Sequence, residues 1–375
     1  MSCPLSKICG GCSYRDMDIS SYHQLKQHNF NKIITSITDS NFKICDPIFI
    51  EDGCRRRATL TFEYKKKKLI LGFNQESSHK IIDINHCPLL TPAINNTLSS
   101  IRKLLEMICS EGWNEKKGKK IIAHNITNGD VFMCEADNGL DIVLEYNEDI
   151  TLFHRMAISE IVQSTTNVIR ISHRRTPFSN TETIIEKAKP YIKIGKYDVY
   201  IPAGTFLQPS REGQQSLSNL VMQYMKNSKG QIADLFCGVG TFSYLLADIP
   251  NVQITAIDSS ETLLKGFQSS VNYNKITNIK TINKNLFKYP LDSEELKSFS
   301  AILFDPPRAG ARAVCQELAN SDYKPEIVVA ISCNPSTFVN DANILIGGGY
   351  KLIEITMVDQ FIYSNHSELV AFFTK

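Results

Sequence analysis

The sequence lacks the features that mark membrane, secreted and fibrous proteins. No apolar run approaches the ~20 residues that a membrane-spanning helix needs, and the N-terminal segment MSCPLSKICGGC has no apolar signal-peptide core. Internal repeats and low-complexity segments are also missing. With 375 residues, of which 42% are hydrophobic, the chain is long enough for two or three domains. We therefore expect a cytoplasmic globular protein that makes no contact with a membrane.

A strong net charge is missing too. The chain has 41 Lys and Arg residues against 39 Asp and Glu residues, which leaves a net charge of +2. This excludes a histone-like protein with a basic surface all round, so any nucleic-acid surface has to be local. Local basic clusters do occur, although each of them also fits a solvated loop or hairpin tip. They lie at residues 55–57, 65–68, 116–120 and 174–175.

The residue pattern changes near residue 200, which predicts a domain boundary there. Between about residues 43 and 200, short alternating runs such as RATLTFEY and KLILGFN indicate strands separated by Gly, Asn and Lys turns. One stretch, residues 91–112, has helical apolar spacing, with Thr91 and Pro92 as start signals and Gly112 as the stop. We expect an α+β domain over residues 1–200.

Buried-type strands alternate with helical stretches in the C-terminal part. The strand runs are QIADLF, VQITAID, IKTIN, AILFDPP and EIVVAIS, and this alternation is typical of a doubly wound α/β fold with a mainly parallel sheet. The last two runs, YKLIEITMVD and SELVAFFT, are too close together for a helical crossover and should form an antiparallel hairpin. We assign this Rossmann-like domain to residues 201–375.

Four cysteines form a candidate metal site in the N-terminal domain. Cys3, Cys9 and Cys12 have the spacing C-x5-C-x2-C, and Cys87 is a fourth candidate far along the chain. Four thiolates complete the ligand set of an iron–sulfur cluster or a structural zinc ion. Zinc modules usually show two close C-x2-C pairs and this chain has one, which favours a [4Fe–4S] cluster.

A glycine-rich turn between a strand and a helix is the candidate cofactor loop. In ADLFCGVGTFSYLLA, Gly238 and Gly240 let the backbone approach a ligand closely. Asp258 ends the next strand, about 20 residues later, where a carboxylate suits a ribose diol. The third glycine of the dinucleotide fingerprint and a phosphate-binding Lys-Ser/Thr pair are missing. Ribose recognition without a phosphate cradle indicates S-adenosylmethionine.

Cys333 follows a buried strand, and Asn334-Pro335 then turn the chain away. Asp305 ends another strand, so both side chains should lie at the carboxyl edge of the sheet, where ligands bind. A thiolate that attacks carbon 6 of a pyrimidine makes carbon 5 nucleophilic enough to take a methyl group. A base must then remove the carbon 5 proton. Glu368 and the nearby His366 are the candidates for that base.

These motifs together resemble the bacterial RNA uracil-5-methyltransferase family over nearly the full chain. The matching segments include CGGC, LGFNQESSHKIIDINHCPLL, FLQPS, DLFCGVGTF, DPPRAG, SCNP and DQFIYSNHSE. The resemblance implies Cys333 as nucleophile and Glu368 as base, S-adenosylmethionine as cofactor, and a cluster held by Cys3, Cys9, Cys12 and Cys87. It also implies cofactor or uracil contacts by six residues, namely Phe206, Gln208, Gly238, Asp258, Asn285 and Asp305.

The resemblance has departures that bear on the substrate. Ile362-Tyr363-Ser364 stand where the family usually has Pro-His-Thr, and Ser210 stands where it usually has Asn. The sequence begins at the cysteine cluster, so the small RNA-binding β-barrel that leads some members is not expected. This is similar to the compact rRNA enzymes, and we expect 23S rRNA as the substrate, with uridine 54 of tRNA as the alternative. The resemblance implies no obligate protein partner.

Three other hypotheses remain. A cytosine-5 RNA methyltransferase also uses a cysteine, but usually in a Pro-Cys context, whereas Asn334-Pro335 follow the thiol here. A radical methyltransferase combines a cluster with S-adenosylmethionine, but typically has a C-x3-C-x2-C motif, which this chain lacks. A non-catalytic RNA-binding iron–sulfur protein would keep the fold and cluster, and the departures at residues 362–364 permit it.

Overall fold

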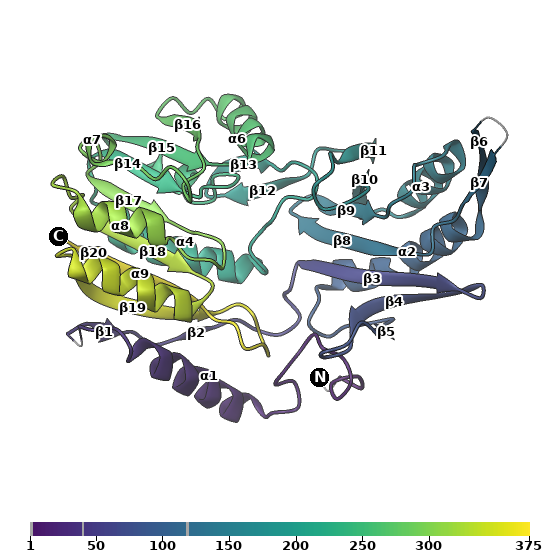
Figure 1. The fold of residues 1–375 in the computed structure, drawn as a ribbon, viewed down its shortest axis with the longest axis horizontal. Helices are drawn as coiled ribbons and strands as arrows, with labels where there is room; N and C mark the ends of the chain where they lie inside the picture. Colours follow the sequence, from purple (N-terminus) through teal and green to yellow (C-terminus); the bar gives the residue numbers. More distant parts are fainter. Residues whose placement is uncertain (1–2, 40, 118–119) are drawn as a thin grey trace. The chain divides into compact units, whose positions relative to one another are not determined.

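A computed structural model describes residues 3–39, 41–117 and 120–375 of the chain. The expected basic cluster at residues 116–120 includes positions outside these ranges. Within them, the contacts define two compact units (Figure 1). The first comprises Met1–Asp16, Glu51–Ile192 and Ile201–Ser210, and the second comprises Met17–Ile50, Lys193–Tyr200 and Arg211–Lys375. The units therefore follow spatial contacts and cross the sequence-based boundary at residue 200.

The first unit is built on a seven-stranded sheet with the order β11-β10-β9-β8-β3-β4-β5. β9 and β10 run parallel, and the other neighbours run antiparallel. Buried and more exposed side chains alternate along most of β3, as expected of a sheet with one solvated face. The strands are β3 (Arg57–Lys65), β4 (Lys68–Asn74), β5 (Ile81–Asp83), β8 (Asn128–Ala136), β9 (Gly139–Glu145), β10 (Val168–Arg174) and β11 (Glu182–Glu186); β6 (Trp113–Lys117) pairs separately with β7 (Lys120–His124).

Two helices share a hydrophobic core with this sheet. α2 (Pro92–Ser110) confirms the helix expected at residues 91–112, and it contributes Leu98, Ile101 and Leu105 to the core. α3 (Leu152–Ser164) was not predicted, because its residues lie among the short alternating runs that indicated strands. Its N-terminus is a capping box between Thr151 and His154, in which histidine replaces the usual Glu or Gln.

The second unit contains a nine-stranded, mainly parallel sheet with the order β1-β19-β20-β18-β17-β14-β15-β16, and β2 also pairs with β19. β20 is antiparallel to both β18 and β19, which confirms the expected C-terminal hairpin. The strands are β1 (Lys43–Ile44), β2 (Ile48–Phe49), β14 (Gly230–Leu235), β15 (Val252–Asp258), β16 (Ile279–Asn283), β17 (Ala301–Phe304), β18 (Ile327–Ser332), β19 (Lys351–Asp359) and β20 (Glu368–Thr374); β12 (Tyr191–Ile194) and β13 (Tyr197–Tyr200) form a separate pair.

Helices cover both faces of this sheet, so the doubly wound arrangement expected from the sequence is confirmed. On one face, α1, α8 and α9 share a core with the odd-numbered side chains of β20, such as Phe373. On the other face, Tyr224 of α4 stacks on Phe372 at a centroid distance of 4.6 Å. The helices are α1 (Ile19–Ile34), α4 (Arg211–Met225), α5 (Ser243–Leu246), α6 (Glu261–Tyr273), α7 (Ser293–Leu296), α8 (Arg312–Asn320) and α9 (Pro335–Gly347).

An N-terminal segment belongs to this C-terminal sheet. α1 packs against α9, and Phe30 and Ile34 of α1 are buried in the core below it. β1 and β2 then extend the sheet beside β19 (Figure 1). No local pattern predicts this arrangement, because the partners are about 300 residues away.

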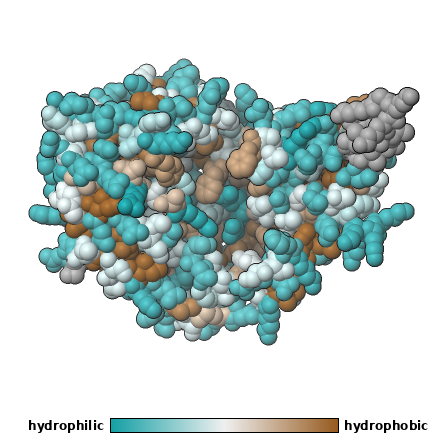
Figure 2. Space-filling view, viewed as in Figure 1, coloured by the Kyte–Doolittle hydropathy of each residue, from teal (hydrophilic) through white to brown (hydrophobic). Residues whose placement is uncertain are grey.

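Among the described helices, none is long and apolar enough to cross a bilayer. On the face drawn in Figure 2, the described hydrophobic side chains are scattered among hydrophilic ones rather than gathered in one broad area. This distribution is ordinary for a protein surface, which always carries some single apolar residues.

Candidate active site

Cys333 and Glu368 lie opposite each other at the carboxyl edge of the second unit's sheet. In the β18–β20 ladder, Ser332 pairs with Leu369. One further step in the same register brings Cys333, directly after β18, opposite Glu368, the first residue of β20. Opposite residues of an antiparallel pair have Cβ atoms ~4.5–5.5 Å apart. The thiol and the carboxyl group can therefore contact the same small planar ring.

The chain turns sharply after Cys333, as the sequence predicted. Asn334 is the N-cap of α9, and its side chain accepts a hydrogen bond from the backbone N–H of Ser336 at 3.1 Å. Pro335 occupies the first turn of the helix, where its missing N–H costs nothing. Cys333 remains partly exposed at the N-terminal end of α9. The positive end of a helix favours a thiolate over a thiol.

Asp305 joins this pair from the neighbouring strand, β17. Burial raises the pKa of Asp305 and also that of Glu368, and Asp305 raises the Glu368 pKa further by repulsion. Burial, Glu368 and Asp305 raise the pKa of Cys333 to about 11, and Arg308 acts in the opposite direction. At neutral pH the thiol thus carries its proton, which must leave when the sulfur attacks a substrate.

Gln360 fixes the Glu368 carboxyl group. Its side-chain Nε2 donates a hydrogen bond to Glu368 Oε2 at 2.8 Å, and both side chains are almost fully buried. Sequence reasoning missed Gln360 and Arg308, although both stand inside the motifs DQFIYSNHSE and LFDPPR. His366, the competing candidate base, is an exposed residue, and burial, Arg308 and Lys26 lower its pKa.

In the glycine-rich loop after β14, Gly238 is hydrogen-bonded to Asp258. The Gly238 N–H donates to Asp258 Oδ2 at 2.9 Å, and Asp258 Oδ1 accepts from the Ser260 N–H at 2.8 Å. Gly238 has φ +56°, and an added Cβ would meet no atom within 4 Å, so the loop faces open space there. Backbone exposed in this way can approach a ligand closely.

Gly240 is required for packing against α6. Its φ is +88°, and a Cβ would lie 2.4 Å from the ring of Phe267 on α6. The missing side chain therefore makes room for the packing of α6. The sequence predicted close approach to a ligand at both glycines, and the open space at Gly238 fits that role better.

Asn285 lies in the segment after β16, beside the strand that ends in Asp258. Its Oδ1 accepts hydrogen bonds from the N–H groups of Phe287 and Lys288, at 3.1 and 3.3 Å. The exposed ring of Phe287 lies 5.3 Å from the ring of Phe236, which follows β14. Asn285 thus shapes a loop with an aromatic side chain at the same sheet edge.

Phe206 and Gln208 belong to the first unit, where two arginines hold their segment. Arg56 is buried, and its Nε donates to the Gln208 carbonyl at 3.0 Å. The Arg57 guanidinium lies over the Phe206 ring, 4.0 Å from its centroid, and donates to the Leu207 carbonyl at 3.3 Å. Phe206 is 58% exposed. An aromatic ring backed by a guanidinium and open to solvent is suited to stack on a base.

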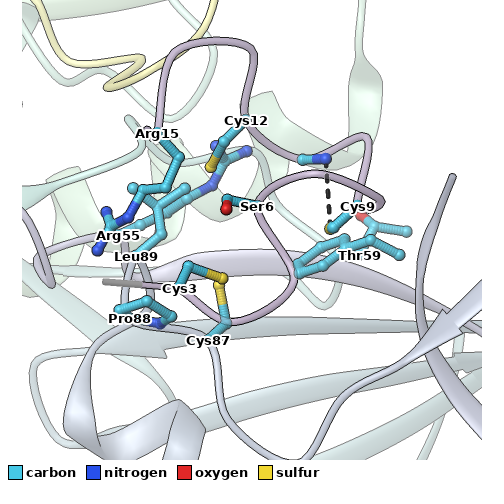
Figure 3. A pocket seen from close by; sticks show the side chains of 12 residues that line it. Cys3, Ser6, Cys9, Cys12, Arg15, Arg55, Thr59, Cys87, Pro88 and Leu89 are labelled. Atoms are coloured by element: carbon cyan, nitrogen blue, oxygen red, sulfur yellow. Dashed lines mark hydrogen bonds between the residues drawn. The ribbon is translucent and has the colours of Figure 1, made fainter. Parts of the chain in front are cut away.

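The four predicted cluster cysteines line one cavity of the first unit. Cys3, Cys9, Cys12 and Cys87 surround a volume of about 250 Å³ together with Arg15 and Arg55 (Figure 3). The Cys3 and Cys87 side chains point toward each other in Figure 3, and all four residues are free cysteines. Within residues 3–39, 41–117 and 120–375, no three potential ligands are close enough to hold a single metal ion.

The environment of these thiols combines burial with positive charge. Burial raises the pKa of Cys12 to about 12 and also raises the Cys87 pKa, whereas Arg15 lowers the Cys12 value. Arg55 lies close enough to Cys12 and Cys87 for both to stabilise its charge. The Gly11 N–H donates to Cys9 Sγ at 3.4 Å. Cationic side chains and an N–H donor are the neighbours that buried thiolates require.

Comparisons with known proteins identify the family of this chain. Residues 55–375 match the family model described as tRNA (Uracil-5-)-methyltransferase. An uncharacterized RNA methyltransferase of Agrobacterium fabrum is 34% identical over 374 residues, which cover 99% of this chain and 83% of the relative. The 23S rRNA (uracil(1939)-C(5))-methyltransferase RlmD of Aliivibrio salmonicida is 28% identical over 98% of this chain and 80% of its own length.

A solved structure shares the fold over the whole chain. It is the tRNA (uracil-54, C5)-methyltransferase of Pyrococcus abyssi in complex with S-adenosyl-L-homocysteine, with a TM-score of 0.73 and 22% identity. The likeness covers 100% of this chain and 87% of the other. The chain belongs to the tRNA (uracil-5-)-methyltransferase family.

Proposed function

We propose that this chain methylates carbon 5 of a uridine in RNA. The observation that carries the proposal is the position of Cys333 opposite Glu368 at the sheet edge, with Asp305 on the adjacent strand. A nucleophile and a base that lie side by side are what carbon 5 methylation through a covalent adduct needs. S-adenosylmethionine, when bound, supplies the methyl group.

The first step is attack by Cys333 sulfur on carbon 6 of the uracil. The thiol proton leaves as the carbon–sulfur bond forms, and the electron pair of the carbon 5–carbon 6 double bond moves toward carbon 5 and the carbonyl group. Asp305 is the neighbouring carboxyl group that can take that proton, which leaves Glu368 as a carboxylate for the second step. Carbon 5 then forms its bond to the methyl group, and S-adenosylhomocysteine is the leaving group.

The second step restores the ring and releases the enzyme. Glu368 takes the carbon 5 proton, the double bond re-forms, and the sulfur leaves carbon 6 as a thiolate. The raised pKa of Glu368 makes its carboxylate a stronger base than an exposed glutamate. The hydrogen bond from Gln360 holds one carboxylate oxygen in place, so the other can face the substrate.

The cofactor site we propose consists of Gly238, Asp258 and Asn285. Asp258 lies where a carboxylate can bind the two ribose hydroxyls, and the open space at Gly238 leaves room beside it. Phe206 and Gln208 would contact the uracil or the cofactor. The observation in support is that Arg56 and Arg57 fix the backbone of this segment and leave the Phe206 ring exposed.

A [4Fe–4S] cluster held by Cys3, Cys9, Cys12 and Cys87 is the group that best fits the thiol cavity. A structural zinc module usually has two close C-x2-C pairs, whereas the spacing of these cysteines contains one. The four thiolates would hold the cluster, and Arg15 and Arg55, which line the same cavity, would supply positive charge beside them. We assign the cluster a structural or RNA-contacting role in the first unit.

We propose 23S rRNA as the substrate, because the relative from Aliivibrio salmonicida that matches 98% of this chain is named for that RNA. The first unit would bind RNA and the second would carry out the chemistry. Phe206 with Arg57 and the exposed basic loop at Lys65–Lys68 offer the stacking and phosphate contacts that such binding uses.

Covalent trapping tests the proposed chemistry. In RNA made with 5-fluorouridine, carbon 5 carries no proton, so the adduct cannot break down after methyl transfer. We expect a complex that resists denaturation, requires S-adenosylmethionine, forms with wild type and Cys45→Ser, and is lost in Cys333→Ala. Trapping by 5-fluorocytidine RNA alone would indicate cytosine chemistry, and trapping by Cys333→Ala would exclude Cys333 as the nucleophile.

A further inference from the structure

Two side chains of α1 are bound to the end of β19, far away in sequence. The Tyr22 hydroxyl donates to Asp359 Oδ2 at 2.5 Å, and Lys26 Nζ lies 2.9 Å from Asp359 Oδ1. The three side chains are 1%, 3% and 1% exposed. Both oxygens of a buried carboxylate are therefore engaged by one helix.

The same two side chains hold the loop between Gln360 and Glu368. Lys26 Nζ also donates to the carbonyl of Ser364 at 3.0 Å and to the carbonyl of His366. Lys26 thus forms an ion pair with Asp359 and donates hydrogen bonds to two points of the loop. The Tyr22 hydroxyl accepts a hydrogen bond from the Tyr363 N–H at 2.8 Å.

These contacts stabilise a loop with an uncommon backbone. Tyr363 has φ +58°, the left-handed region that a bulky residue rarely adopts. Its ring lies 4.9 Å from the ring of Tyr22. Tyr363 is also the middle residue of Ile362-Tyr363-Ser364, where this chain departs from the usual family sequence. The tyrosine of α1 and the tyrosine of the loop therefore form one packed unit.

The loop bears on catalysis because Glu368, the proposed base, stands at one end of it and Gln360, which donates a hydrogen bond to Glu368, stands at the other. Asp359 is followed by Gln360, which donates to Glu368 at 2.8 Å, and Glu368 closes the loop. Contacts at residues 359, 363, 364 and 366 leave little freedom for the residues between them. We infer that Tyr22 and Lys26 are positioning residues that hold Gln360 and Glu368 for removal of the carbon 5 proton. The inference rests on the proposed function and adds a specific element to it.

If Tyr22, Lys26 and Asp359 served folding alone, their variants would show a different pattern of kinetic effects. A buried ion pair can serve folding alone, and its loss would then lower the amount of folded enzyme and slow every step alike. A positioning role predicts that adduct formation at Cys333 continues, because Cys333 is held by β18 and α9. Only the step that needs Glu368 would become slow.

The test uses the full-length protein with 23S rRNA from cells that lack the gene. Tyr22→Phe removes one hydroxyl and keeps the ring, Lys26→Met removes the ammonium group, and Lys32→Met changes an exposed lysine of the same helix as the control. Measured quantities are the burst of methyl transfer, steady-state kcat, KM and the fraction of enzyme in a denaturation-resistant RNA complex.

We expect kcat of Tyr22→Phe and Lys26→Met to fall about 10–100-fold, the loss typical of a displaced catalytic group, with burst and KM unchanged. The covalent complex should accumulate, and Lys32→Met should behave as wild type. A burst reduced as much as kcat, or normal turnover without the complex in Tyr22→Phe, would overturn the inference. If Lys26→Met does not fold, the result for Tyr22→Phe alone decides between a positioning role and a purely structural role. A wild-type protein that transfers no methyl group would instead contradict the proposed function.

Discussion

Cys333 lies opposite Glu368 across the β18–β20 ladder, one step beyond the last pair, Ser332 and Leu369. The two residues come from strands that run in opposite directions, so the end of one strand and the start of the other meet at the same edge. Burial raises the pKa of Cys333, and Glu368 raises it further by repulsion. The chemistry of the site follows from this pairing.

Replacing Glu368 with glutamine should separate the two chemical steps. Glutamine keeps the size of the side chain but cannot accept the carbon 5 proton, so the adduct on Cys333 persists after methyl transfer. We expect turnover to fall about 10²–10⁴-fold, the usual contribution of a general base, with a covalent protein–RNA complex in its place. Gel electrophoresis under denaturing conditions detects the complex, and a Glu368→Gln enzyme that turns over normally would exclude Glu368 as the base.

The pH dependence of adduct breakdown should report the paired carboxyl groups. Burial and Asp305 raise the pKa of Glu368, so the side chain stays protonated, and inactive as a base, to a higher pH than an exposed glutamate. Breakdown should accelerate as pH rises between about 5 and 9, with a midpoint above the ordinary glutamate value of ~4.3. The midpoint belongs to the coupled pair.

Asp305→Asn is the matched variant for this measurement. It removes the negative neighbour, so the midpoint should move to lower pH, whatever happens to the absolute rate. A midpoint that does not move in Asp305→Asn would show that Asp305 does not influence the base.

The two loop glycines should respond differently to alanine. At Gly240 the new methyl group would overlap the Phe267 ring at φ +88°, so folding stability should fall by about 2–5 kcal/mol. At Gly238 only the left-handed backbone matters for folding, a cost of about 1–2 kcal/mol, but the methyl group would occupy the open space beside Asp258. Thermal unfolding and calorimetric titration with S-adenosylhomocysteine distinguish the two effects. Equal losses of stability, with unchanged ligand affinity in Gly238→Ala, would contradict this assignment.

The cysteine cavity should hold iron. Cys9→Ser or Cys87→Ser should lose the iron content and visible absorbance of protein purified without oxygen, whereas Cys54→Ser, a cysteine of the same unit outside the cavity, should keep both. Elemental analysis gives the answer independently of activity. Zinc at one ion per chain, or iron retained in both cavity variants, would contradict a cluster held by these four residues.

The elements that could be predicted are those whose start and end are marked by residues next to them in the sequence. β4 and β15 have the same bounds as the runs KLILGFN and VQITAID, because turn residues flank apolar stretches at both ends. Asn334-Pro335 likewise predicted the end of β18 and the turn after it, and the structure shows that α9 starts there. The strand-end rule for parallel sheets then placed Asp305 and Cys333 on one edge without further information.

The parts that could not be predicted depend on long-range contacts. No pattern in the sequence of α1 predicts that Tyr22 and Lys26 bind Asp359, which is more than 330 residues away. α3 lacked the usual Glu or Gln of a capping box, since His154 takes that place. The role of Gly240 follows from the position of Phe267, which only the packing of α6 reveals.

The most direct test of the account is a map of 5-methyluridine across tRNA and 23S rRNA in cells lacking this gene, and in the same cells complemented with wild type or Cys333→Ala. We expect one 23S rRNA uridine to lose its methyl group in the cells that lack the gene and to regain it only with wild type. Loss at uridine 54 of tRNA would keep the chemistry and change the substrate. Unchanged 5-methyluridine at every position would contradict the central claim that the chain methylates uridine in RNA.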